Sequence, residues 1–548
     1  NNNIKTEIAL FLLALNLLHK ENLINNIQFT NTICFNCAGN NQIEVELKNW
    51  LKTLGNLKAK REYIQLLKQN IPTQRDILGL IYQSLLAEGE KSQNGSYYTP
   101  QAIVNDITEE YKHKNGNILD PCCGTGQFLL AMSKYTKKPE NLYGLDIDKI
   151  AVRIARINIL IAYKDIKFVP NIFQVNTLLH EHINPLFAKT IELPLTFDLI
   201  ITNPPWGTHY NKEVTENLKQ IYPQIKSNES FSYFLVKSIN SLDNNGDLSF
   251  ILPESILNVK NHSDIRKFIL QNTCLKRIVC LNRVFKNVFS AVIRIDLNRK
   301  MTKTNNNLLT IRKDNVSYKI PQKRLSQNQD NIFDINANKE DTTIFAKIFE
   351  LEHTTLKNNA DWALGIVTGD NKKYLSDKKR EGYEEIAKGN DIKSFTLRKL
   401  NNYILFAPDK FQQTAPEYKY RAKEKLIYRF ISNKLVFAYD NNQILTLNSA
   451  NIVIPKLADY PIKVILALFN SSVYQFIFQK KFSSIKVLRS HIEYLPLPLL
   501  KKPVLDRIEL LSNKTIKSNS CFEKLDDFIM ELFSISQKEK AYIKGAIK

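Results

Sequence analysis

The stretch "ILDPCCGTGQFLL", residues 118–130, decides the fold. It starts as a buried apolar strand, ends that strand with Asp120, and turns through Gly124 and Gly126 into a helix. Glycines permit positive φ and let a ligand approach the backbone and the helix N-terminus. The phosphate-loop patterns G-x-G-x-x-G and G-K-[ST] do not occur in it, and the acid suits a cationic or amino-acid-like ligand. Taken alone, the loop is equally well explained as a plain strand-to-helix turn.

A second acid stands at a similar place 26 residues later. "NLYGLDID", residues 141–148, ends another apolar strand with Asp146. In doubly wound sheets that bind nucleosides, an acid at this place accepts hydrogen bonds from the ribose hydroxyls. Asp120 and Asp146 together predict a nucleoside cofactor site at the carboxyl ends of two neighbouring strands.

Short apolar strands alternate with helical segments from Asn117 onward, which predicts a mostly parallel sheet covered by helices. The candidate strands are residues 117–120, 141–147, 197–203, 246–253, 275–282 and 291–297. A polar stretch rich in Asn, Lys and Gln, residues 301–341, marks the end of this pattern.

The flanking segments differ from this α/β pattern. Leu/Ile-rich periodicity predicts helices before residue 73, and "IPTQRDILGLIYQSLL", residues 71–86, begins a new helix. Short β-like runs follow the polar stretch, and then one apolar helix over residues 464–482 and a charged helical tail. We expect a helical N-terminal region at 1–73, a catalytic domain at 74–330, a linker at 331–356 and a mixed α/β domain at 357–548.

Composition restricts the partners. A net charge of +22 over 548 residues favours a polyanion such as nucleic acid, although a basic solvated surface explains it equally well. Seven cysteines are few, which fits a reducing compartment. Cys34 and Cys37 form a lone C-x-x-C with no second pair at zinc spacing, so no metal is predicted. The apolar run at residues 8–18 is too short for a bilayer span, and no membrane association is expected.

Four motifs in a fixed order resemble those of a known family. "GSYYTP" at 95–100, the glycine loop, "YGLDID" at 143–148 and "NPPW" at 203–206 are similar to the gamma group of amino-methylating DNA methyltransferases. The resemblance covers about Ile71 to Asn298. It implies a Rossmann-like seven-stranded class I methyltransferase sheet, S-adenosylmethionine as the cofactor, and a target recognition domain after the catalytic domain.

The resemblance also assigns roles to residues. Thr99 is expected near the methionine moiety, Asp120 near its amino group, Asp146 at the ribose and Ile147 at the adenine. Asn176 stands where the family usually has Asp, and its amide oxygen still offers an acceptor to the adenine amino group. The full set of expected cofactor contacts is Tyr98, Thr99, Asp120, Pro121, Gly124, Gly126, Phe128, Asp146, Ile147 and Asn176.

The fourth motif suits methyl transfer to an exocyclic amine, whose lone pair is delocalised into the base ring. The Asn203 side chain and the Pro204 carbonyl offer two acceptors for its N–H bonds, and Pro204 and Pro205 hold them rigidly. The target base must leave the duplex, and Trp206 and Phe285 are expected to stack on it, with Phe289 as the alternative to Phe285. The family more often has Tyr or Phe at position 206. Similar motifs serve RNA-guanine and protein-glutamine methylation.

Three C-terminal segments resemble the recognition domain of TaqI-like methyltransferases and their restriction–modification relatives: residues 364–375, 387–395 and 482–498. Three lysines lie near glycines and suit contacts with DNA phosphates: Lys372, Lys373 and Lys388. An ordinary solvated surface would explain each of these lysines as well. We therefore expect an enzyme that methylates N6 of a flipped adenine in double-stranded DNA in a restriction–modification or phage-defence system. Restriction or defence subunits are expected partners, and the bacterial cytoplasm, at the nucleoid, is the expected location. The alternatives are an RNA amino-methyltransferase and a catalytically silent DNA-binding subunit.

Overall fold

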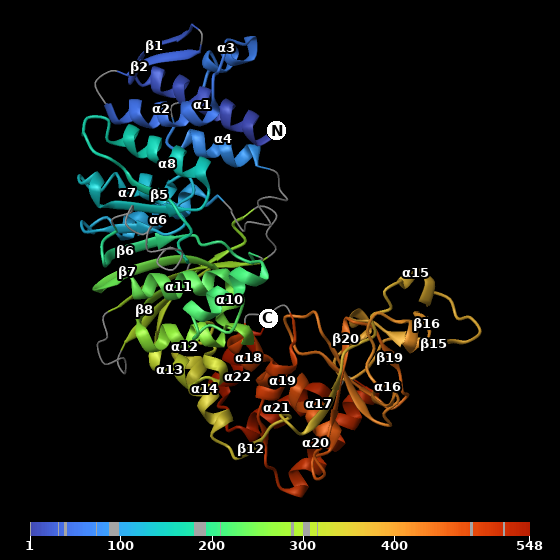
Figure 1. Cartoon of the computed structure of the whole chain (residues 1–548). Helices are drawn as coiled ribbons and strands as arrows, with labels where there is room; N and C mark the ends of the chain where they lie inside the picture. Colours follow the sequence, from blue (N-terminus) through green and yellow to red (C-terminus); the bar gives the residue numbers. More distant parts are fainter. Residues whose placement is uncertain are drawn as a thin grey trace. The chain divides into compact units, whose positions relative to one another are not determined.

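The chain forms two compact units, Asn1–Phe333 and Asp334–Lys548 (Figure 1). The structure is a computed structural model. It describes residues 2–30, 32–37, 41–72, 74–86, 98–179, 193–208, 210–285, 290–299, 307–314, 316–482, 486–518 and 521–547.

A mixed sheet forms the centre of the first unit, and nine of its strands fall within the described residues. Their order is β11-β10-β8-β9-β7-β6-β3-β4-β5. The strands are β3 (Ile118–Asp120), β4 (Leu142–Asp146), β5 (Asn171–Gln174), β6 (Phe197–Thr202), β7 (Leu242–Pro253), β8 (Cys274–Asn282), β9 (Val292–Asn298), β10 (Leu308–Lys313) and β11 (Val316–Pro321). All six strands expected from the apolar runs are present, so the predicted sheet is confirmed.

The strand order reverses beside β3, and this reversal determines where a ligand site is expected. β3 pairs in parallel with β4 on one side and with β6 on the other. β9 runs antiparallel between β7 and β8, which completes the seven-stranded class I methyltransferase arrangement. Ligands of doubly wound sheets bind at such a reversal, at the carboxyl ends of the strands. Asp120 and Asn203 stand at those ends of β3 and β6.

Two strands extend this sheet beyond the expected seven. β10 pairs in parallel with β8, and β11 pairs with β10 as a hairpin. The polar stretch at residues 301–341, which was expected to mark the end of the α/β pattern, therefore contains two further strands of the sheet. Both strands are short, and half of their residues face away from the core, so their composition resembles that of a polar loop.

Helices cover the sheet and supply most of its core. They are α6 (Gln101–Glu110), α7 (Gln127–Met132), α8 (Lys149–Ala162), α10 (Lys212–Ile221), α11 (Ser230–Asn240), α12 (Ser263–Asn272) and α13 (Gln322–Gln327). α6, α7 and α8 share one apolar cluster with β3, β4, β6 and β7. α8 starts at Asp148, whose carboxylate caps Ile150 and Ala151.

The N-terminal region belongs to the same compact unit. It comprises α1 (Asn2–Lys20), β1 (Ile24–Phe29), β2 (Ile33–Cys37), α2 (Asn41–Leu54), α3 (Arg61–Leu67) and α4 (Ile77–Leu85). Figure 1 shows these helices in blue beside α8, and their apolar residues form one cluster with Ala151, Ile154 and Leu160 of α8. The region, which was expected to be mostly helical, also contains the β1–β2 hairpin. Strands of five or six residues are too short for periodicity to identify.

The second unit is a mixed α/β domain, as predicted. Its sheets have the orders β13-β20-β17-β18 and β14-β16-β15-β19, with β12 paired to β21. These strands are β12 (His353–Thr354), β13 (Ala360–Ala363), β14 (Leu375–Ser376), β15 (Tyr383–Ala387), β16 (Tyr403–Leu405), β17 (Lys425–Arg429), β18 (Phe437–Asp440), β19 (Leu445–Thr446), β20 (Ala450–Pro455) and β21 (Leu497–Pro498). The helices are α14 (Lys339–Phe349), α15 (Asn371–Tyr374), α16 (Glu417–Tyr420), α17 (Ile462–Asn470), α18 (Ser472–Lys481), α19 (Arg489–Tyr494), α20 (Lys502–Lys517), α21 (Phe522–Leu532) and α22 (Gln537–Ala546).

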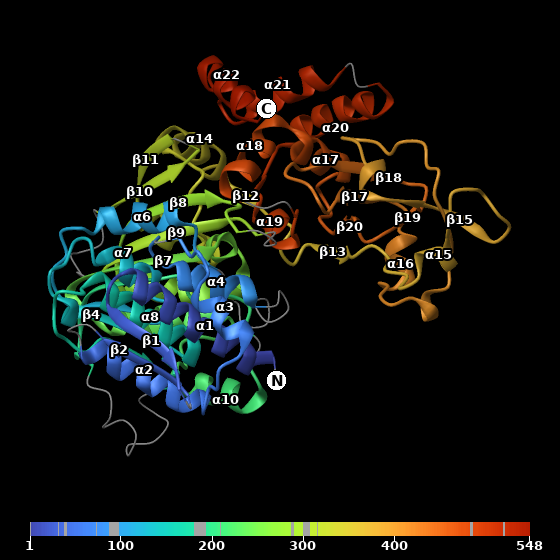
Figure 2. The same ribbon diagram turned by 90° about the horizontal axis from the view of Figure 1, so that it is seen from above.

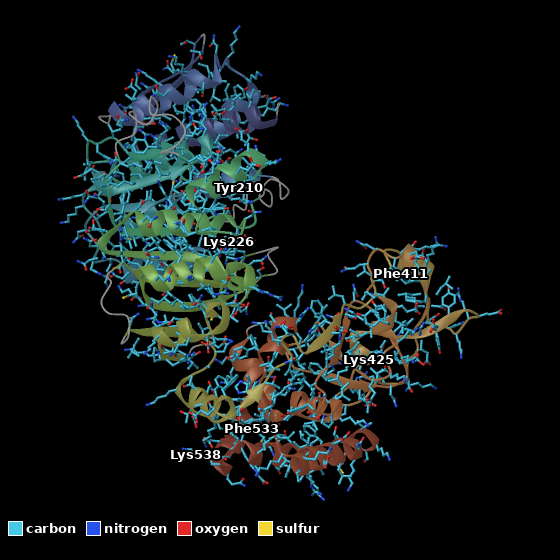
Figure 3. The ribbon with its side chains drawn as sticks, turned by 60° about the horizontal axis from the view of Figure 1, so that its bottom comes forward. Tyr210, Lys226, Phe411, Lys425, Phe533 and Lys538 are labelled. Carbon is cyan, nitrogen blue, oxygen red and sulfur yellow. The ribbon has the colours of Figure 1, made fainter. Side chains whose placement is uncertain are left out.

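Two buried features organise this unit. Lys425 is fully buried and forms an ion pair of 2.5 Å with Asp440 across β17 and β18. Figure 2 shows the two strands, and Figure 3 labels Lys425. The single apolar helix expected over residues 464–482 was wrong, because the chain bends by 62° at Ser471, whose side chain caps α18. Within the described residues no single helix is long and apolar enough to cross a bilayer, and the bent pair of α17 and α18 meets that test by length and composition only.

Candidate active site

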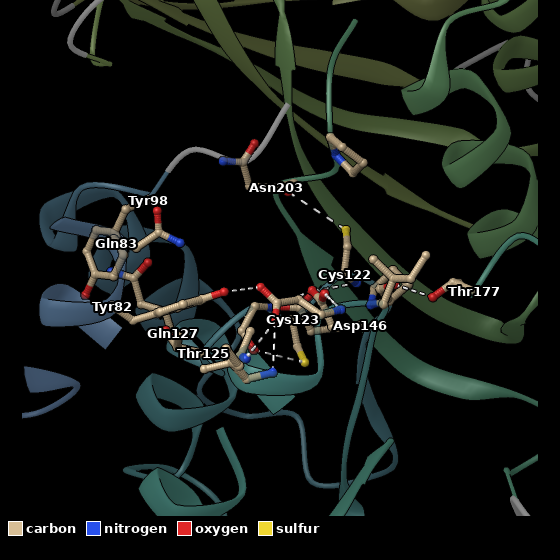
Figure 4. Close-up of a pocket in the computed structure, with 18 of the residues that line it drawn as sticks. Tyr82, Gln83, Tyr98, Cys122, Cys123, Thr125, Gln127, Asp146, Thr177 and Asn203 are labelled. Atoms are coloured by element: carbon tan, nitrogen blue, oxygen red, sulfur yellow. Dashed lines mark hydrogen bonds between the residues drawn. The ribbon is translucent and has the colours of Figure 1, made fainter. Parts of the chain in front are cut away.

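A cavity of about 610 Å³ opens at the carboxyl ends of β3, β4 and β6 (Figure 4). It brings together eleven of the residues singled out from the sequence. They are Tyr98, Thr99, Asp120, Pro121, Gly124, Phe128, Asp146, Ile147, Asn176, Asn203 and Pro205. Gly126, Pro204, Trp206 and Phe285 are not among the lining residues.

The glycine loop and the second acid are bonded to each other. The Gly124 amide donates to Asp146 Oδ2 at 2.7 Å, and the Asp148 amide donates to Asp146 Oδ1 at 2.9 Å. Gly124 has φ +51°, and a Cβ added there would meet no atom within 4 Å, so the loop leaves open space above its backbone. Gly126 has another role, since a Cβ there would lie 3.1 Å from the Cβ of Ala155 on α8.

Asp120 is held at the centre of a buried polar network. It is 2% exposed and accepts from the Thr202 hydroxyl at 2.6 Å and from the Cys122 amide at 3.2 Å. The Cys122 sulfur lies 2.9 Å from the same hydroxyl of Thr202. Burial, together with the charge of Asp146, raises the pKa of Asp120 to about 7 against the bonds from Thr202 and Cys122, which lower it. A cationic ligand would restore the charged form of this carboxyl.

Burial also raises the pKa of Asp146, to about 6, against the bonds from the Asp148 and Gly124 amides that lower it. Ile147, the next residue, is 68% exposed on the cavity wall and offers an apolar surface. The Asn176 amide oxygen accepts from the Leu178 amide at 3.1 Å, which fixes the side chain at the rim. Two acids, an exposed apolar side chain and a bare glycine backbone fit a cationic nucleoside such as S-adenosylmethionine.

The N-P-P-W motif follows β6 directly and contacts the Tyr-Thr-Pro motif. The Asn203 amide nitrogen donates to the Thr99 hydroxyl at 3.2 Å. Thr99 is 3% exposed, and its carbonyl accepts from the Gln127 side chain at 2.8 Å. The Ser230 hydroxyl donates to the Pro205 carbonyl. Because its nitrogen points to Thr99, Asn203 directs its amide oxygen elsewhere.

The two aromatic candidates contact each other. Trp206 and Phe285 lie edge to face, with ring centroids 5.4 Å apart and planes at 82°. The Trp206 indole donates to the Ile251 carbonyl of β7 at 3.3 Å, and Phe285 is 8% exposed. Both rings pack on the core of the sheet. Phe289, the alternative to Phe285, lies outside the described residues.

Several lining residues were missed from the sequence. They are Tyr82, Gln83, Leu85 and Leu86 at the end of α4, and Tyr210 and Phe234 beyond the N-P-P-W motif. Figure 4 shows Tyr82, Gln83 and Tyr98 grouped on one side of the site. Tyr210 follows the motif closely, which was the one available signal for it. The sequence of α4 gave no signal of a site, because its apolar residues follow the same period as those of any buried helix.

The lysines noted in the second unit differ from one another. Lys372 and Lys373 are exposed on α15. Lys388 donates to the Asn402 side chain at 2.5 Å, so its ammonium group is already bonded within the unit.

Comparison with protein families finds two matches. The model of N-6 DNA methylases matches residues 73–368, and the model of the TaqI-like C-terminal specificity domain matches residues 384–497.

The curated relatives are similar over part of the chain. The type II methyltransferase M.VspI of Vibrio sp. (strain 343) is 30% identical over 315 residues, which cover 57% of this chain and 74% of that protein. The type I restriction enzyme MjaIX methylase subunit of Methanocaldococcus jannaschii is 27% identical, with 39% of each chain covered. The type II methyltransferase M.HincII of Haemophilus influenzae is 31% identical, over 38% of this chain and 37% of that protein.

Solved structures share the fold at low identity. The type IIL restriction-modification enzyme MmeI in complex with DNA gives a TM-score of 0.65 at 12% identity. The match covers 91% of this chain and 85% of the MmeI chain. A nuclease-deletion mutant of the type ISP restriction-modification enzyme LlaGI, bound to a DNA substrate mimic, gives 0.57 at 13% identity, with 93% and 62% covered.

Proposed function

The chain belongs to the N-6 DNA methylase family and is an S-adenosylmethionine-dependent adenine DNA methyltransferase, and from that premise we propose how its residues act. The observation that carries the proposal is the single cavity that joins Asp120 and Asp146 to Asn203. Methyl donor and target amine need such a shared space to react.

Asp120, Asp146 and the glycine loop hold the cofactor in this proposal. The Asp120 carboxylate pairs with its amino group, the Asp146 carboxylate accepts from the ribose hydroxyls, and the Gly124 backbone lies under it. Ile147 and Asn176 contact the adenine. When bound, S-adenosylmethionine supplies a methyl group on a sulfonium centre.

Asn203 and Pro204 act on the target amine. The amide oxygen of Asn203 and the carbonyl of Pro204 accept hydrogen bonds from its two N–H groups. These bonds draw the nitrogen out of conjugation with the ring and stabilise the positive charge that develops on it. The bond from Asn203 to Thr99 supports this role, since it commits the amide nitrogen and directs the oxygen elsewhere. The prolines and the hydrogen bond from Ser230 to Pro205 keep the loop rigid. Because the two acceptors free the nitrogen lone pair for methylation, no strong general base is needed.

Trp206 and Phe285 receive the flipped adenine. Their edge-to-face contact leaves no space between the two rings, so the base stacks on the outer face of one ring or the rings separate when it enters. Stacking on an aromatic ring returns about 1–3 kcal/mol per base, which offsets part of the energy of flipping.

The second unit selects the DNA site in this proposal. Its match to the TaqI-like C-terminal specificity domain and the DNA complexes formed by MmeI and LlaGI support that assignment. The relatives support a role in a restriction–modification system, with double-stranded DNA as the proposed substrate and restriction subunits as proposed partners. Its place of action is then the bacterial cytoplasm, at the nucleoid.

Transfer of a labelled methyl group by the purified chain tests the proposal. We expect incorporation into N6 of adenine in duplex DNA, none into RNA, and loss of incorporation in Asn203→Ala while S-adenosylmethionine still binds. Incorporation into RNA alone would support an RNA amino-methyltransferase. Cofactor and DNA binding without any incorporation would support a silent DNA-binding subunit.

A further inference from the structure

α4 lies outside the catalytic sheet, yet the residue that precedes it contacts segments of the cofactor site, and residues at its end line the cavity. Asp76, which precedes α4, is 4% exposed and accepts three side-chain hydrogen bonds. The donors are Tyr98 Oη at 3.1 Å, Thr125 Oγ1 at 3.1 Å and Asn158 Nδ2 at 2.7 Å. They belong to the Tyr-Thr-Pro motif, the glycine loop and α8, so one carboxylate joins four segments of the chain.

The backbone around Asp76 is shaped for this arrangement. Asp76 has φ +56°, which is unusual for a residue other than glycine. Gly79, one turn later, has no room for a side chain, since a Cβ would lie 2.1 Å from Asp76 Oδ1 and 2.4 Å from Thr125 Oγ1. Burial raises the pKa of Asp76 to about 6, against the bonds from Tyr98, Asn158 and Thr125 that lower it. A buried carboxyl with these partners is costly to retain, which points to a positional role.

A second contact leaves the same face of α4 one turn further on. Tyr82 is 4% exposed, lines the cavity, and donates from its hydroxyl to Asp148 Oδ2. The Asp148 amide in turn donates to Asp146, the acid assigned to the ribose, and its other carboxylate oxygen caps α8. Figure 4 shows Tyr82 and Tyr98 next to each other on one side of the site.

We propose that α4 is a positioning element of the cofactor site, with Asp76 fixing the glycine loop and Tyr82 fixing the loop that carries Asp146. The inference rests on the proposed cofactor site. Asp76, Gly79 and Tyr82 follow one another at intervals of three residues, so they share one face of the helix. That face of α4 packs against the glycine loop and the loop that carries Asp146. Both loops therefore keep their geometry before the cofactor binds. Preorganisation of this kind lowers the cost of binding.

Calorimetric titration of the full chain with S-adenosylmethionine tests the inference on Tyr82→Phe, which removes one hydroxyl and keeps the ring. We expect its Kd to rise about tenfold, as for the loss of one hydrogen bond to a carboxylate, with a Tm close to that of the wild type. Gly79→Ala keeps every bonding group but drives a methyl group into Asp76 and Thr125. The Kd of Gly79→Ala is expected to rise more than that of Tyr82→Phe. Alanine favours a helix more than glycine does, so a loss of helix propensity would not explain this rise.

Ser84→Ala is the matched control on the same helix. Ser84 is exposed and donates to the Ile81 carbonyl within α4, so its Kd should equal that of the wild type. A double-mutant cycle of Tyr82→Phe with Asp148→Asn should be non-additive if the two side chains act together.

The outcomes separate this inference from the proposed function. Equal Kd in the wild type and Tyr82→Phe would overturn the positioning role alone, as would a fall in Tm without a change in Kd. A wild-type chain that does not bind S-adenosylmethionine would overturn both.

Discussion

The two ends of the cavity are built in different ways. At the cofactor end, buried carboxylates and backbone amides bond to one another, as Gly124 and Asp148 do with Asp146, so the site is formed before a ligand binds. At the amine end, Asn203 and Pro205 line the cavity, while Trp206 and Phe285 are occupied by their mutual contact. The difference indicates that cofactor binding needs little rearrangement, whereas in the proposed mechanism a flipped base either stacks on the outer face of one ring or separates the aromatic pair. Substitutions at the two ends should therefore affect different steps.

Asn203→Ala should give the largest effect at the amine end. Loss of one preorganised hydrogen-bond partner at a reacting centre lowers kcat by about a hundredfold or more. The Kd of S-adenosylmethionine should change little, and single-turnover methylation together with calorimetry measures both quantities. Near-normal methylation by this variant would refute the assigned role of Asn203.

Asp146→Ala should show the opposite pattern at the cofactor end. Losing the ribose acceptor and the anchor of the Gly124 amide should raise the Kd of S-adenosylmethionine by about ten- to a hundredfold. At saturating cofactor, kcat should fall much less than in Asn203→Ala. Asp146→Asn, which keeps one acceptor oxygen, is the control and should lie between the wild type and Asp146→Ala. An unchanged Kd in Asp146→Ala would place the ribose elsewhere.

Acidification should weaken the cofactor end selectively. Burial raises the pKa of Asp120 to about 7 and that of Asp146 to about 6, and in the proposed site both acids bind the cofactor as carboxylates. Affinity should therefore be full above pH 7 and fall as the pH drops through 7 and 6, by up to about tenfold per unit from Asp120 alone. Calorimetry from pH 8 to 5.5 measures the slope, which Asn203→Ala should retain. A flat profile would contradict the pairing with Asp120.

The same carboxyl has the opposite consequence for the stability of the free chain. Its folded pKa lies above the ordinary value of 3.8, so the folded state binds more protons than the unfolded state between about pH 4 and pH 7. The contribution of Asp120 to the free energy of unfolding is thus larger at low pH and is lost as the pH rises through 7. Bound cofactor should reduce this dependence in thermal unfolding.

Trp206→Phe should give the smallest effect, because an aromatic ring remains for stacking. Its KM for DNA should stay within about threefold of the wild type, whereas Trp206→Ala should lose about tenfold, as expected for one base–aromatic stack. Fluorescence of a 2-aminopurine at the target position reports flipping directly. Equal flipping by Trp206→Ala and the wild type would assign the stacking to Phe285 alone.

The sequence revealed those parts of the fold that short segments specify. Apolar runs that end in Asp120, Asp146 and Asn203 identified three strands of the sheet and the edge at which they meet. It did not reveal β5, β10, β11 or the N-terminal hairpin, since strands of four to six partly exposed residues lack a clear period. The break at Ser471 was hidden by uniformly apolar flanks.

The sequence by itself determined the chemistry, because a strand that ends in an acid before a glycine turn, or in Asn-Pro-Pro, carries its functional groups within a few covalent bonds. Only the tertiary structure decided how those groups are held. Asp76 meets Asn158 across 82 residues, and Tyr82 meets Asp148 across 66. Such contacts depend on how α4 and α8 pack, and helical periodicity shows which face is buried without showing what it is buried against.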